Sequence, residues 1–125
     1  MRNERGFTLL SVLLAVSMLT IGLLALARTQ AILTSSEAGV SNRAIALAIA
    51  TDRLEQLRAS DPQTLASEPA AAVDANGNVS AGGAYQRSVT VTLDAANLLR
   101  LTVVVTYPRM TSPVQLQALI YRRTT

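Results

Sequence analysis

The sequence contains no cysteine, no histidine, no tryptophan and no lysine. Without cysteine the fold cannot use disulfides, and cysteine-ligated metal sites are excluded. Without histidine the chain lacks the usual general base and the commonest metal ligand. One Phe and three Tyr are the only aromatic residues, so few side chains could stack on nucleic-acid bases. These absences argue against an enzyme and against a bound cofactor or metal.

Charge is also scarce, because only 15% of the residues are charged. The acidic residues are scattered, and no pair has a spacing that suggests acid–base catalysis. The formal net charge of +3 is a small excess, so it is weak evidence for a nucleic-acid partner. Arg122 and Arg123 could touch DNA phosphates, but a solvated strand end is the simpler interpretation. At 125 residues the chain has room for one small domain, and we predict that it is not an enzyme.

An uncharged, mostly apolar run extends from Phe7 to Ala27, behind a short polar segment at residues 1–6. As a helix rising about 1.5 Å per residue, this run could cross a hydrocarbon layer of ~30 Å. The basic residues ahead of it predict a cytoplasmic N-terminus, with everything after Arg28 on the periplasmic side. A cleaved secretory signal is the alternative, although only Ala25-Leu26-Ala27 partly matches its cleavage site.

The helical pattern continues past this run, because residues 28–59 contain no proline. One helix is therefore expected from Phe7 to Ala59, with residues 7–27 in the membrane or a filament core and residues 28–59 amphipathic. Asp61-Pro62 should end it. The predicted apolar stripe of the second half consists of Ala44, Leu47, Ala48, Thr51, Leu54 and Arg58. The predicted polar side consists of Asn42, Arg43, Asp52, Arg53 and Gln56.

Residues 60–84 are rich in turn formers and are interpreted as a connecting loop, with room for a short helical turn or a marginal strand. Three runs of alternating polarity follow, at residues 85–93, 98–107 and 114–122. Their short linkers favour antiparallel pairing. The fold class predicted is α+β, with a long N-terminal helix packed on a small antiparallel sheet of three to four strands. Residues 85–125 and 30–59 would form one globular headgroup.

The segment Arg5-Gly6-Phe7-Thr8-Leu9-Leu10 resembles the class III signal of type IV prepilins. This resemblance implies cleavage between Gly6 and Phe7 by a prepilin peptidase, which would then methylate the new N-terminal amine of Phe7. Residues 1–6 would be the leader peptide. Glycine at the cut gives an uncrowded backbone that an active site can approach closely.

The resemblance extends beyond the signal. Residues 21–30 and 54–58 are similar to the PilV group of minor pilins, and residues 103–122 resemble the final hairpin of PilV and of the minor pseudopilin GspI. The chain departs from the family at Ser11, where the family usually has Glu. That Glu is thought to neutralise the N-terminal amine of a neighbouring subunit, because an unpaired ammonium in an apolar core is costly. Ser11 supplies no charge, which argues against efficient methylation and against repeated addition into a filament. It fits a low-copy subunit.

The resemblance implies a structural minor pilin that enters, or primes assembly of, a type IV pilus. Its partners would be the prepilin peptidase, the major pilin, other minor pilins, the inner-membrane assembly platform and membrane lipid. It would first lie in the inner membrane and later in the pilus at the cell surface. The alternatives are a minor pseudopilin of a type II secretion system, a pilus-tip adhesin or DNA-binding module, and an unrelated single-pass membrane protein.

Overall fold

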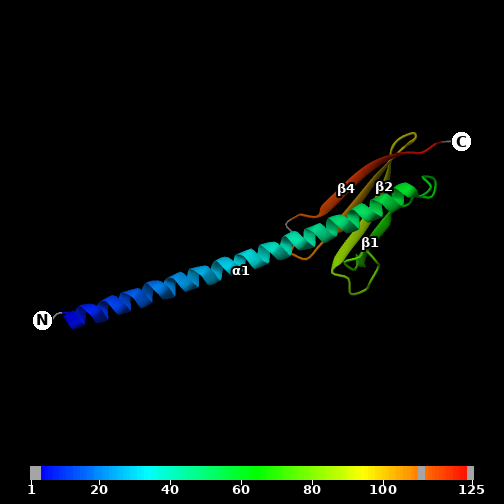
Figure 1. Ribbon diagram of the computed structural model, residues 1–125. Helices are drawn as coiled ribbons and strands as arrows, with labels where there is room; N and C mark the ends of the chain where they lie inside the picture. Colours follow the sequence, from blue (N-terminus) through cyan, green and yellow to red (C-terminus); the bar gives the residue numbers. More distant parts are fainter. Residues whose placement is uncertain (1–3, 110–111, 124–125) are drawn as a thin grey trace. The chain divides into compact units, whose positions relative to one another are not determined.

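The computed structural model describes residues 4–109 and 112–123 (Figure 1). The fold is α+β, with one long helix and a four-stranded sheet, which confirms the predicted fold class. The chain divides into two compact units, Met1–Ala38 and Gly39–Thr125, and the helix contributes to both. The elements are α1 (Glu4–Ala59), β1 (Glu68–Val73), β2 (Tyr85–Ala95), β3 (Leu98–Thr106) and β4 (Val114–Tyr121).

Helix α1 has no internal proline and ends where the sequence predicts. The N–H of Ser60 donates to the carbonyl of Gln56, which closes the last turn. Asp61 then begins a turn, because its Oδ1 accepts the N–H of Gln63 at 2.9 Å. With Pro62 next in the chain, the residue before it is disfavoured in helical conformation. The helix therefore ends because of the Asp61 turn and Pro62, and its end does not require contact with the sheet.

The sheet is an antiparallel meander with the strand order β1-β2-β3-β4. β3 shows the alternation expected of a sheet with one covered face, because Leu99, Leu101, Val103 and Val105 are buried while the residues between them are partly exposed. In β2 the alternation ends before the strand does. Leu93 is 58% exposed although it pairs with Leu99, and the register with β3 shifts just after it, between Leu93 and Ala95.

The segment at residues 60–84, interpreted from sequence as a connecting loop, contains strand β1. The strand signal is weak because β1 reads Glu-Pro-Ala-Ala-Ala-Val, and alanine and proline are depleted in strands. Pairing with β2 supplies what local propensity lacks, through a register that runs to Val73 opposite Tyr85. After β1 the chain turns at Gly77, one of the turn formers of this segment, whose positive φ of 83° suits glycine.

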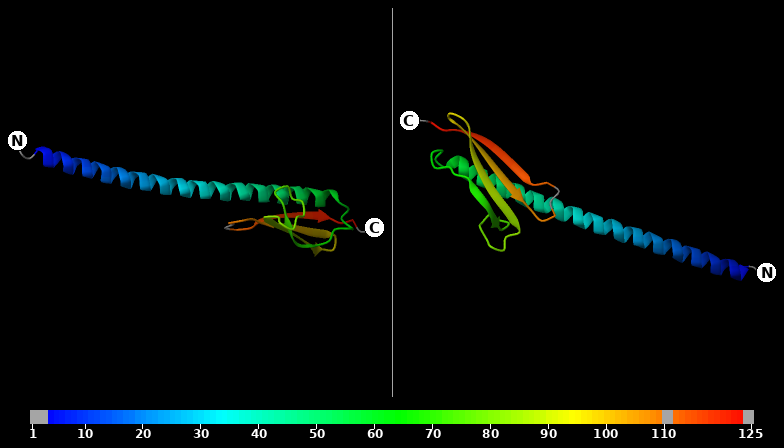
Figure 2. Two further views of the ribbon diagram at one scale, coloured as in Figure 1. Left: turned by 90° about the horizontal axis from the view of Figure 1, so that it is seen from below. Right: turned by 180° about the vertical axis from the view of Figure 1, so that it is seen from behind.

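The face of α1 that covers the sheet differs from the predicted stripe. Ala44, Leu47, Ala48 and Thr51 are exposed, and of the predicted stripe only Leu54 packs against the core. In the second unit, the part of α1 from Gly39 to Ala59 and the sheet form two layers (Figure 2). The helix residues that pack there are Ile45, Ala46, Ile49, Ala50, Leu54 and Leu57. This stripe carries larger aliphatic side chains than the predicted one, so it removes more apolar area from water.

Two residues assigned from sequence to the polar side of α1 lie at this interface instead. Asn42 accepts the hydroxyl of Tyr85 through Oδ1 at 3.3 Å and donates to the carbonyl of Pro108. Arg53 forms an ion pair with Glu68 at the start of β1. Polar side chains can border a buried face when hydrogen-bond partners are present, and here the strands and the loop after β3 provide them. These pairs tie the helix to segments that lie far apart in the sequence.

Candidate functional site

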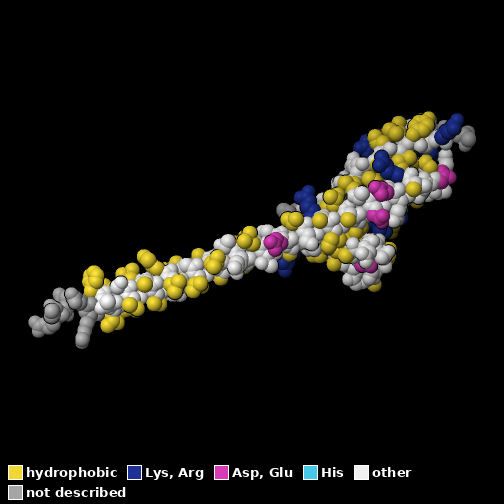
Figure 3. Space-filling view, in the orientation of Figure 1, with side chains coloured by type: hydrophobic (Ala, Val, Ile, Leu, Met, Phe, Trp, Pro, Cys, Tyr) yellow, Lys and Arg dark blue, Asp and Glu magenta, His cyan; other side chains and the backbone are white. Residues whose placement is uncertain are grey.

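The first candidate site is the uncharged segment of α1, over residues 7–27. Every side chain in it is exposed, and its apolar residues include Phe7, Leu13 and Leu24. Figure 3 shows hydrophobic side chains along this part of the helix without acidic or basic groups between them. The most apolar window of α1 has a mean hydropathy of 2.6, and none of it is buried. By length and composition alone, this helix could span a membrane.

The hydroxyl groups in this segment are compatible with a nonpolar environment. Ser17 Oγ donates to the carbonyl of Leu13 at 2.7 Å, and Thr20 Oγ1 donates to the carbonyl of Val16 at 2.6 Å. Both hydroxyls are therefore satisfied within their own helix. Such bonds lower the cost of placing Ser and Thr in hydrocarbon or against neighbouring helices.

The Gly6–Phe7 bond lies in the first turn of α1. The first four N–H groups of a helix have no intrahelical acceptor, so this turn opens more easily than the helix interior. Glycine weakens a helix by about 1 kcal/mol relative to alanine, which further favours opening at Gly6. A Cβ added at Gly6 would meet no atom within 4 Å. The bond is therefore exposed and approachable from outside the chain, and it lies in a helical turn that opens easily.

Phe7 and Ser11 share one face of α1. With Leu10 and Leu14 they line a shallow recess of about 180 Å³. If the chain is cut before Phe7, an ammonium group forms at the positive end of the helix dipole, which is unfavourable. A carboxylate one turn along would offset that charge, but Ser11 offers only a hydroxyl. The geometry thus brings Phe7 and Ser11 together, and none of the described side chains that line the recess carries a charge to pair with the amine.

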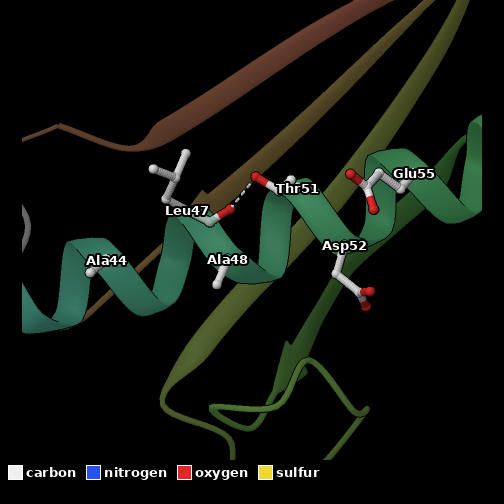
Figure 4. A pocket seen from close by; sticks show the side chains of 6 residues that line it. All are labelled: Ala44, Leu47, Ala48, Thr51, Asp52 and Glu55. Carbon is white, nitrogen blue, oxygen red and sulfur yellow. Dashed lines mark hydrogen bonds between the residues drawn. The ribbon is translucent and has the colours of Figure 1, made fainter.

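A second feature is the exposed face of α1 in the sheet-bearing unit. Figure 4 shows six side chains on the side of the helix turned away from the strands. They form an open groove of about 470 Å³ lined by Ala44, Leu47, Ala48, Thr51, Asp52 and Glu55. Thr51 Oγ1 donates to the carbonyl of Leu47, and Asp52 accepts Nε2 of Gln56. The groove is apolar at one end and acidic at the other.

The turn after β1 is organised around the carboxylate of Asp74. Its Oδ1 accepts the N–H groups of Asn78 and Asn76, each at 2.9 Å. The bond from Asn78 in particular holds the pKa of Asp74 below its usual range. The sequence interpretation identified the turn but not this role of Asp74. The described residues contain no cluster of three or more acidic side chains that could hold a metal ion.

The comparisons with known proteins identify the first segment. Residues 1–27 match the family model described as the prokaryotic N-terminal methylation motif. Searches of curated proteins and of solved structures returned no match. The motif match and the apolar helix together support a type IV pilin-like protein, anchored by its N-terminal helix and processed by a prepilin peptidase.

Proposed function

We propose that this chain is a structural minor pilin, cut between Gly6 and Phe7 and then incorporated into a type IV pilus or used to prime its assembly. The observation that carries the proposal is the methylation motif over residues 1–27, which includes the uncharged segment of α1, whose side chains are all exposed from Phe7 to Ala27. Burial of such a surface against lipid, and later against sister helices, removes a large apolar area from water.

Ser11 supports a minor role over a major one. A subunit repeated along a filament needs its N-terminal ammonium paired at every position, since an unpaired charge in an apolar core is costly. Among the described side chains, those that line the recess around Phe7 and Ser11 include no carboxylate. A subunit present once or a few times, near the tip, escapes that requirement. We therefore place this chain among low-copy subunits of the PilV type.

The proposed topology follows from the charges around the helix. Arg2 and Arg5 precede the apolar segment, and Arg28 follows it. Basic residues that flank a membrane helix favour the cytoplasmic side of the membrane. Two of these three arginines precede the segment, so the N-terminus of the helix would lie in the cytoplasm. The sheet would then lie in the periplasm before assembly and at the cell surface afterwards. Membrane lipid, the major pilin, other minor pilins and the assembly platform are its proposed partners.

Deletion of this chain should strongly reduce the number of surface pili, and expression of the full chain should restore it. The measurement is the amount of major pilin sheared from cells, with electron microscopy as a second readout. Secretion of type II substrates serves as the matched control and should not change. If secretion fails while pili remain, the minor pseudopilin function replaces this one. If both persist and only adhesion or DNA uptake is lost, a tip-binding function is favoured.

A further inference from the structure

The outer edge of β4 carries backbone groups that face away from the sheet. The N–H of Arg122 donates to the carbonyl of Asn97, at the end of a β3–β4 register that runs without a shift from Leu98↔Tyr121 to Val105↔Val114. In an antiparallel pair, bonded and non-bonded residues alternate. The backbone groups that point outward are therefore those of Gln115, Gln117, Leu119 and Tyr121.

The opposite edge of the sheet is protected. β1 contains Pro69, which lacks an N–H, and its register with β2 shifts between Glu68 and Ala71. The chain also folds back over the end of β1, because Val79 bridges to Val73 and the N–H of Ser80 donates to Ala72. Proline, irregular register and a covering loop are the devices by which proteins block an edge strand.

β4 has none of these devices. Its sequence, Val-Gln-Leu-Gln-Ala-Leu-Ile-Tyr, contains neither proline nor a charged residue. On its outer face Leu119 is 54% exposed and Tyr121 is 67% exposed. Leu116 and Ile120, on the helix-facing side, are only partly buried against the core. An added strand would cover both rows of side chains, so this edge combines free backbone groups with apolar area still to be buried.

A buried donor without an acceptor marks the end of this edge. Among the described residues, Nε of Arg122 is buried without a hydrogen-bond partner, and so is Nε of Arg53, whose Nη2 already pairs with Glu68. By strand alternation Arg122 lies on the same side as Ile120. Arg100, by contrast, already donates to both carboxylate oxygens of Asp94. A buried guanidinium donor without an acceptor is unfavourable, so Arg122 favours a partner that brings a carboxylate.

We propose that the β4 edge binds an extended segment of a different protein as a fifth strand, with apolar residues on its helix-facing side and a carboxylate beside Arg122. A second copy of this chain fits poorly. Residues 114–121 contain no carboxylate, so β4 pairing with β4 would offer Arg122 only neutral acceptors and no opposite charge. Head-to-tail pairing would need the β1 edge, which Pro69 and the returning loop block. This inference does not depend on which filament the chain enters.

The test uses the full chain in detergent micelles and a labelled peptide, acetyl-Asp-Thr-Val-Thr-Val-Thr-Val-amide. In an antiparallel arrangement its Asp lies beside Arg122 and its Val residues lie beside Ile120, Ala118 and Leu116. The control peptide has Asn in place of Asp. Fluorescence anisotropy should show that the Asp peptide binds at least about tenfold more tightly than the Asn peptide, because the Asn peptide cannot form a charge-assisted hydrogen bond with Arg122.

Two variants separate the backbone from the charge. Leu119→Pro removes an outward N–H while keeping the hydrogen bonds between β3 and β4. It should weaken binding of the Asp peptide by at least about tenfold. Leu119→Ala keeps that N–H and is its matched control. Arg122→Gln should abolish the preference for the Asp peptide over the Asn peptide. This variant tests the proposal even in the case that Leu119→Pro does not fold. Absence of peptide binding, equal binding of both peptides to the unaltered chain, or self-association through β4 would overturn the proposal.

Discussion

Replacing Gly6 with valine is expected to leave the chain uncut, with its leader still attached. The substitution causes no clash within the protein itself, since a Cβ at Gly6 meets no atom within 4 Å. Any loss must then arise where the peptidase backbone approaches the scissile bond, at which a β-branched side chain would displace the reacting groups. A displacement of about 1 Å can lower a rate about 100-fold. The readout is the ratio of uncut to cut chain in cells that express the peptidase.

Gly22 provides the matched control for this experiment. It lies in the same helix, within the uncharged segment, and a Cβ added there also meets nothing within 4 Å. Gly22→Val therefore makes the same chemical change at a position that the peptidase should not contact. Cleavage should proceed normally in this variant. Equal cleavage of both variants would mean that Gly6 is not part of the recognised site.

Ile49→Ala is expected to destabilise the sheet-bearing unit by about 2–5 kcal/mol. Ile49 is 3% exposed and lies in the core, and its Cγ2 would stand 3.7 Å from a Cβ added to Gly77. Truncation would leave a cavity between α1, the sheet and the turn after β1. Alanine is the strongest helix former, so the loss cannot come from helix propensity.

Leu47→Ala is the matched control, because Leu47 is two residues away on the same helix and 47% exposed. Its effect on stability should stay within about 0.5 kcal/mol. Urea unfolding of the full chain in micelles can be followed by near-ultraviolet circular dichroism of the buried residues Tyr85 and Tyr107. The predicted stripe would have required the reverse order. If Leu47→Ala is the more damaging change, the packing described for α1 is wrong.

Much of the fold follows from local patterns in the sequence. The absence of proline before Pro62 defines a long helix, and period-two alternation defines β2, β3 and β4 to within two residues. These signals are strong because a helix forms its backbone hydrogen bonds within itself, and because the alternation of a strand repeats over many residues. The motif around Gly6 and Phe7 is equally local, so it can be recognised without a structure.

The face of α1 and the strand β1 were harder to predict because both depend on tertiary contacts. Residues 44–58 carry two stripes at helical spacing, and only the sheet decides which one is buried. Arg53 was assigned to the wrong side because a charged residue normally indicates solvent, yet here it pairs with Glu68. β1 is rich in alanine and becomes a strand because β2 offers hydrogen bonds.

The groove on the outer face of α1 is a consequence of this choice. Once the larger side chains cover the sheet, the small residues Ala44 and Ala48 remain on the surface with Leu47. A helix face of small residues allows another helix to approach closely. The stripe identified from sequence is therefore a real apolar feature, assigned to the wrong neighbour. In the proposed assembly it would face other subunits.

The N-terminal mass of the chain, isolated from membranes and from sheared pili, tests the account most directly. We predict a first residue of Phe7, with the leader of residues 1–6 absent and the whole uncharged helix retained. The mass of one added methyl group would further identify the modified amine. A chain that still begins at Met1 in a cell with active prepilin peptidase, or one that begins beyond Ala27, would contradict the account.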